Sequence, residues 1–165
     1  MEQKHTISIL VNDQPGVLTR VANLMGQRGF NIDSITVGPS EEKGLSRMII
    51  VTQGDEPTLE QVMKQFNKLV DVYKVSLLSN APMVSRELAL IKVEASSSNR
   101  AEINVLINPF RASIVDVGPN TLVIQCTGDT NKINALVELL SPFGIRELAR
   151  TGVTAISRGM AAVKA

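Results

Sequence analysis

The sequence predicts an α+β fold of two tandem βαββαβ units, each an antiparallel sheet with helices on one face. Three observations lead to this prediction. The hydrophobic pattern alternates between the two-residue period of strands and the spacing of helices, and the whole order occurs twice. The turn-rich segment Ser79-Asn80-Ala81-Pro82 separates the halves. A chain of 165 residues, 44% of them hydrophobic, can bury two small cores.

The first half contains every element of one unit in order. Residues 6–11 alternate as a half-buried strand. Pro15 fixes φ and lacks an N–H, which suits a helix start, and Asp55 is the expected N-cap of a second helix with Pro57 in its first turn. The predicted strands are 6–11, 31–37, 47–52 and 71–77, and the predicted helices follow Pro15 and Asp55.

The second half repeats this order. Asn99 and Glu102 have the spacing of a capping box, and Pro109 is expected to end or kink the helix that follows Asn99. The predicted strands are 87–94, 112–117, 122–127 and 145–150, with a second helix between the last two. Each unit is thus expected to be a ferredoxin-like sandwich. The predicted domains are residues 1–79 and 83–159, followed by a tail at 160–165.

The third predicted strand is apolar on both faces. Ile49 and Val51 lie on one side, and Met48 and Ile50 on the other. Two helices can cover only one face of the sheet, and an exposed apolar face usually meets a partner. The sequence therefore favours a homodimer that associates through its sheets or their edges.

The segment from Asp13 to Leu18 is the main candidate for a ligand site. The N–H groups of Gly16, Val17 and Leu18 lie at a helix start, which favours a carboxylate or phosphate. Asn31 offers a donor and an acceptor, as an α-amino acid requires, and is expected beside the same turn. Ordinary turn chemistry is the alternative interpretation. The candidate binding residues are Asp13, Gln14, Pro15, Gly16, Val17, Leu18, Asn31 and Ile32.

Catalytic and metal-binding groups are scarce. His5 is the only histidine and is expected on the surface of the first strand. Cys126 is the only cysteine and is expected to be a buried, inert thiol. One histidine and one cysteine do not make a zinc site, and no phosphate-binding glycine-rich loop is present. We expect no catalytic residue and no metal site in this chain.

The composition of the chain argues against nucleic acid and membranes as binding partners. The net charge is +1, which gives no large field for attracting nucleic acid or an anionic membrane. The βαββαβ order also describes RNA-recognition domains, but the third strand, residues 46–52, lacks the aromatics that stack bases. The single cysteine, the polar N-terminus and the short apolar runs predict a cytoplasmic protein without a signal peptide or membrane span.

Several segments together resemble one family, the regulatory (small) subunits of acetolactate synthase, also called acetohydroxyacid synthase. The similarity extends over nearly the whole chain, in the segments NDQPGVLTRV (Asn12–Val21), RGFNIDSITVG (Arg28–Gly38), SRMIIVT (Ser46–Thr52), KLVDVYKVS (Lys68–Ser76) and ARTGVTAISRG (Ala149–Gly159). The resemblance implies an N-terminal ACT domain that binds valine or another branched-chain amino acid between two ACT domains.

The resemblance also implies the partners. The family's large catalytic subunit holds thiamine diphosphate, magnesium and FAD, so no cofactor is expected in this chain. The small subunit activates the large one and confers feedback inhibition. At Asp13 the family pattern carries an asparagine, so the turn here is more acidic. The second unit has no Pro-Gly turn like that of the first. It is therefore expected to have a transmitting or stabilising role and not to sense the amino acid.

Two other classes of function remain as alternatives. An amino-acid-responsive transcriptional regulator would need a helix-turn-helix or a basic face, and neither is apparent. A small metabolic enzyme on a ferredoxin-like fold would show turnover by the purified chain.

Overall fold

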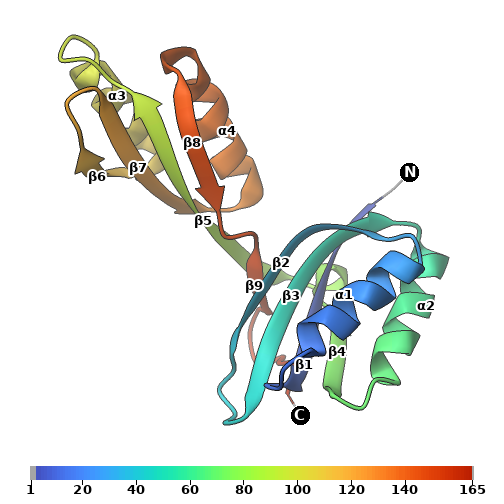
Figure 1. Cartoon of the computed structure of the whole chain (residues 1–165). Coiled ribbons are helices and arrows are strands. Elements are labelled where there is room, and N and C mark those ends of the chain that lie inside the picture. The colour runs from blue at the N-terminus through green and yellow to red at the C-terminus, as the bar shows by residue number, and fades with distance from the viewer. Residues whose placement is uncertain (1–2, 165) are drawn as a thin grey trace. The chain divides into compact units, whose positions relative to one another are not determined.

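The computed structural model describes residues 3–164 and divides into two compact units (Figure 1). Unit 1 comprises Met1–Val84 together with Val153–Ala165, and unit 2 comprises Ser85–Gly152. Each has an antiparallel sheet with two α-helices, as predicted. The division differs from the predicted domains because the segment after Gly152 packs with unit 1.

Unit 1 is a βαββαβ sandwich with the sheet order β2-β3-β1-β4. Strand β1 lies between β3 and β4 and pairs with both in antiparallel fashion, so β2 and β4 are the edge strands. The elements are β1 (Gln3–Asn12), α1 (Val17–Gln27), β2 (Asn31–Pro39), β3 (Leu45–Gly54), α2 (Glu56–Asn67), β4 (Val72–Leu77), the short 3₁₀ helix η1 (Leu78–Asn80) and, from the far end of the chain, β9 (Thr154–Ser157).

The core of unit 1 lies between this sheet and the two helices (Figure 1). Each helix places an apolar stripe on the sheet because its hydrophobic residues recur every three or four positions. The buried residues of the stripes are Val17, Val21 and Met25 from α1 and Leu59, Val62 and Phe66 from α2. They pack against Ile7, Ile9, Val11, Met48 and Ile50 of the central strands.

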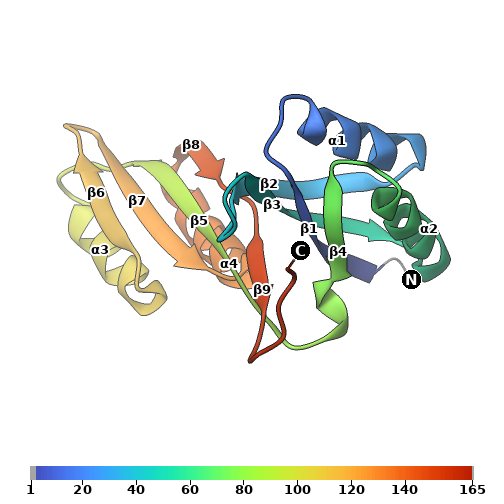
Figure 2. The same ribbon diagram turned by 90° about the horizontal axis from the view of Figure 1, so that it is seen from below.

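The other face of this sheet is covered from within the same chain. Ile49 and Val51 of β3 are 1% and 8% exposed, and they form a second cluster with Leu78, Val153, Ala155 and Val163. The hydroxyl of Thr36 donates to the carbonyl oxygen of Val153 at 3.3 Å. Figure 2 shows this C-terminal segment on the side of the sheet away from α1. The expectation that a partner must cover Ile49 and Val51 was therefore wrong.

Unit 2 repeats the sandwich, with the sheet order β6-β7-β5-β8. Its elements are β5 (Met83–Glu94, of which the first two residues belong to unit 1), α3 (Arg100–Ile107), the 3₁₀ helix η2 (Asn108–Phe110), β6 (Ser113–Val117), β7 (Thr121–Gly128), α4 (Thr130–Leu140), the 3₁₀ helix η3 (Ser141–Phe143) and β8 (Ile145–Arg150). The core is aliphatic, and Cys126 is buried in it. None of the described helices is long and apolar enough to span a membrane.

The observed helix caps agree with the predicted ones at some positions and differ at others. Asp55 caps α2, as predicted, and its carboxylate accepts the N–H of Thr58 at 2.9 Å. Hydrogen bonding from the side chain of Thr58, together with this bond from its N–H, holds the pKa of Asp55 below its usual value. The predicted capping box at Asn99 was wrong, because the Asn99 side chain accepts the N–H of Ser96 at 2.8 Å and caps no helical N–H. Helix α3 ends at Ile107, just before Pro109, as expected.

Candidate functional site

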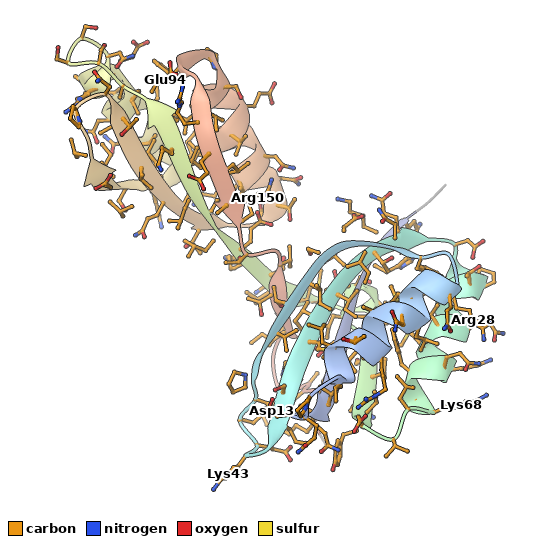
Figure 3. All side chains as sticks on the ribbon, in the orientation of Figure 1. Asp13, Arg28, Lys43, Lys68, Glu94 and Arg150 are labelled. Atoms are coloured by element: carbon orange, nitrogen blue, oxygen red, sulfur yellow. The ribbon has the colours of Figure 1, made fainter. Side chains whose placement is uncertain are left out.

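The turn between β1 and α1 is held in place by main-chain hydrogen bonds. The N–H of Asp13 donates to the carbonyl oxygen of Gly44 at 2.9 Å, and the N–H of Gln14 donates to that of Asn12 at 3.0 Å. The first bond fixes the turn against the loop between β2 and β3, and the second closes the turn itself. Figure 3 shows Asp13 at this end of unit 1, near Lys43 of that loop. The residues from Asp13 to Gly16 are exposed, so the turn faces solvent.

The start of α1 has no side-chain cap. Gly16 occupies the N-cap position with a φ of 85°, and the first turn contains no acidic residue. The N–H of Val17 donates to the carbonyl oxygen of Gln14 at 3.4 Å, whereas those of Gly16 and Leu18 have no acceptor among residues 3–164. An uncapped helix start carries partial positive charge and unpaired donors. This position can therefore accept a carboxylate or a phosphate.

Arg20 lies one helical turn beyond Gly16 and adds a cation that the sequence analysis did not include. A Cβ at Gly16 would lie 3.2 Å from Nη1 of Arg20. The guanidinium is paired with the carboxylate of Asp71, just before β4. The spacing of four residues along a helix is the sequence signal that could have identified Arg20. A side chain at position 16 would therefore contact this guanidinium, and the positive φ of Gly16 would strain it further.

Asn31 and Ile32 lie at the opposite end of the sheet from this turn, which corrects the prediction that they flank it. Asn31 pairs with Gln53, whereas Asn12 pairs with Leu45, eight positions further back along β3. At the usual rise per residue, that offset is roughly 26 Å. Arg28, close before Asn31, is at the far end of α1 from Asp13 in Figure 3. Within one chain, the two halves of the predicted site are therefore far apart.

Comparison with known proteins identifies both units. A family model described as "AHAS small subunit-like ACT domain" matches residues 7–74, and one described as "Small subunit of acetolactate synthase" matches residues 86–159. The "Probable acetolactate synthase small subunit" of Methanothermobacter thermautotrophicus is 56% identical, and the alignment covers 94% of this chain and 93% of that protein. The Bacillus subtilis protein "Acetolactate synthase small subunit" is 51% identical over 94% and 91% of the two chains.

The similarity extends to three dimensions. The crystal structure of the acetolactate synthase small subunit from Thermotoga maritima matches with a TM-score of 0.88 at 44% identity, over 96% of this chain and 99% of that one. The chain belongs to the family of acetolactate synthase small subunits. The predicted family is confirmed, and both halves of the candidate site, the Asp13–Leu18 turn and Asn31–Ile32, lie inside the part matched by the ACT model.

The histidine and the cysteine of this small-subunit chain both lie in its interior. His5 was expected on the surface, but it is 5% exposed, and its Nε2 lies 3.0 Å from the carbonyl oxygen of Gly54. It lies opposite Thr52 of β3, which is also buried. Cys126 is 1% exposed, as predicted, and burial raises the pKa of its thiol. No cluster of metal-ligating side chains occurs among the described residues.

Proposed function

We propose that this chain is the non-catalytic regulatory partner of a catalytic acetolactate synthase subunit and that it senses a branched-chain amino acid. The observation that carries this proposal is the uncapped start of α1, which offers two unpaired N–H groups beside an exposed aliphatic side chain, that of Leu18. The N–H groups suit the carboxylate of an amino acid, and Leu18 suits an aliphatic side chain such as that of valine.

We propose further that the amino acid binds between two copies of the chain. Strand β2 is an edge strand, so its outer N–H and C=O groups can pair with a second β2. If two copies pair antiparallel through β2, the Asn31 end of one strand meets the Pro39 end of the other. The Pro39 end adjoins the Asp13 turn, because Pro39 pairs with Ser46 and Asp13 bonds to Gly44.

Such a dimer brings together the two halves that one chain holds apart. The Gly16 and Leu18 N–H groups of one copy would bind the carboxylate. The side-chain oxygen of Asn31 from the other copy, or the carboxylate of Asp13, would accept the ammonium group. Ligand and association are then linked, because binding stabilises the paired arrangement by mass action.

Reconstitution with a catalytic subunit tests the proposed function. The purified chain alone should not convert pyruvate, because the thiamine diphosphate, magnesium and FAD are proposed to reside in the catalytic subunit. Its addition to that subunit should raise activity and introduce inhibition by valine, with a coupling free energy of about 1–3 kcal/mol. Turnover by the purified chain would contradict the proposal and favour the small-enzyme alternative.

Mixing of two variants tests the two-copy site. Gly16→Asp and Asn31→Ala should each abolish binding in their own dimers. In a mixed dimer, one site combines both altered halves and the other combines two native halves. An equimolar mixture after subunit exchange should therefore recover about a quarter of the native sites, as counted by calorimetry with valine. If both halves belonged to one chain, no native site would form and the mixture would not bind.

A further inference from the structure

Unit 2 contains a polar cavity that lies far along the sequence from the Asp13 turn and has no part in the amino-acid site. Its volume is about 410 Å³, and it lies where β7 ends and α4 begins. Three cationic side chains line it, those of Arg86, Arg111 and Lys132. They come from three separate segments: the start of β5, the residue after η2 and the first turn of α4.

The positive charge of this cavity is not neutralised by the protein. Asp129 is the only carboxylate that lines it, and one of its oxygens accepts the N–H of Lys132 at 2.9 Å to cap α4. None of the three cations forms an ion pair among the residues that the structure describes. Elsewhere in unit 2 the pattern is different, since Lys92, Arg146 and Arg150 each pair with a glutamate.

The backbone holds two of these cations at the cavity. A Cβ at Gly128 would lie 2.5 Å from Cδ of Lys132, so only glycine lets the lysine stem lie across this position. The ammonium group of Lys132 then donates to the carbonyl oxygen of Thr127 at 3.0 Å. Arg111 has a φ of 52° and is the only non-glycine residue with a positive φ in the described chain. Glycine would adopt this conformation more easily, yet the position carries a cation.

We propose that this cavity binds the phosphate group of a small phosphorylated molecule. Two guanidinium groups can each donate a pair of parallel hydrogen bonds to phosphate oxygens, and the lysine adds a point charge. Three cations and one carboxylate leave an excess of two positive charges, which matches the charge of a phosphate, about −1.5 to −2 near neutral pH. The side chains of Gln125 and Thr127 line the same cavity and supply neutral hydrogen-bonding groups for the rest of the molecule.

Calorimetric titration of the full-length chain with inorganic pyrophosphate tests this proposal, with inorganic phosphate as a second probe and citrate as a carboxylate control. Arg111→Gly is the preferred variant, because glycine fits a φ of 52° and the change removes the cation without straining the backbone. Arg86→Gln removes the second guanidinium. Arg146→Gln is the matched control, since Arg146 pairs with Glu94 and does not line the cavity.

We expect saturable binding of pyrophosphate that weakens by about tenfold for each guanidinium removed and is unchanged in Arg146→Gln. Thermal unfolding shows whether each variant is folded, and valine titration should be the same in all of them. Equal binding by the Arg111→Gly variant, tighter binding of citrate than of pyrophosphate, or no saturation at millimolar pyrophosphate would each overturn the proposal. Loss of association with the catalytic subunit without pyrophosphate binding would also contradict it and assign the cations to a protein contact.

Discussion

Replacing Gly16 with aspartate should abolish binding of branched-chain amino acids and, with it, feedback inhibition of the reconstituted enzyme. The new carboxylate would lie at the start of α1, where aspartate is a natural cap, and would occupy the donors that the ligand needs. A Cβ at this position would also lie 3.2 Å from Nη1 of Arg20. Loss of two charge-assisted hydrogen bonds predicts an affinity reduced by about a hundredfold or more.

Two further variants separate the causes of this loss. Gly16→Ala introduces the strain of a positive φ and the contact with Arg20 but no charge, so its affinity should lie between those of the native chain and Gly16→Asp. Gly159→Asp is the matched control, because Gly159 also has a positive φ, of 70°, and a Cβ at that position would meet no atom within 4 Å. Calorimetry with valine, leucine and isoleucine measures all three. Undiminished affinity in Gly16→Asp would place the site elsewhere.

Ending the chain at Gly152 should destabilise unit 1 and expose an apolar surface. The deletion removes Val153, Ala155 and Val163 from the cluster over Ile49 and Val51. Burying two valines and one alanine against a sheet stabilises a fold by roughly 3–5 kcal/mol, so the free energy of unfolding of unit 1 should fall by about that amount. The uncovered face of β3 should then promote aggregation.

Tyrosine fluorescence can follow this loss in unit 1 alone. Tyr73 in β4 is the only tyrosine and the chain has no tryptophan, so the signal does not report on unit 2. Denaturant titrations should show a lower midpoint for the chain that ends at Gly152. A chain that ends at Arg158 keeps β9 and loses only the Val163 contact, so it should unfold between the two. Equal midpoints for all three chains would show that the C-terminal segment contributes nothing to unit 1.

Local sequence signals were sufficient for most of the elements. Asp55 was recognised as a cap because aspartate, proline and a helical apolar pattern follow one another within a few residues. Asn99 was wrongly predicted as a cap for a related reason. The short polar side chain can accept from a nearby loop N–H as well as from the helix, and in the structure it bonds to Ser96. Such a choice depends on loop geometry that the residue types do not determine.

The candidate site was predicted in its parts but not in its arrangement. The Pro-Gly turn and the uncapped helix follow directly from the residues at 13–18. Asn31 was misplaced because α1 carries the chain back along the sheet, so β2 begins at the end where β1 begins. This reversal is inherent in the order strand, helix, strand. The prediction placed Asn31 beside the turn because the two motifs are close in the sequence.

The residues that cover the outer face of β3 could not be predicted from sequence patterns. The sequence showed that Ile49 and Val51 need a covering surface, but Val153, Ala155 and Val163 lie about a hundred positions further along the chain. Local periodicity describes single elements and not which distant elements meet, and the packing of these residues on β3 depends on the path of the whole chain. The burial of His5 was missed for the same reason, since it depends on the pairing of β1 with β3, where His5 lies opposite Thr52.

The return of the C-terminal segment to unit 1 makes unit 2 an insertion within unit 1, and this affects the order of events during synthesis. The ribosome produces the chain from its N-terminus at about 5–20 residues per second. The residues of unit 2 end at Gly152, whereas unit 1 still lacks the segment whose Val153, Ala155 and Val163 cover Ile49 and Val51. The nascent first unit therefore keeps Ile49 and Val51 uncovered until the final residues emerge, and the inserted unit is the first of the two that can reach its finished fold.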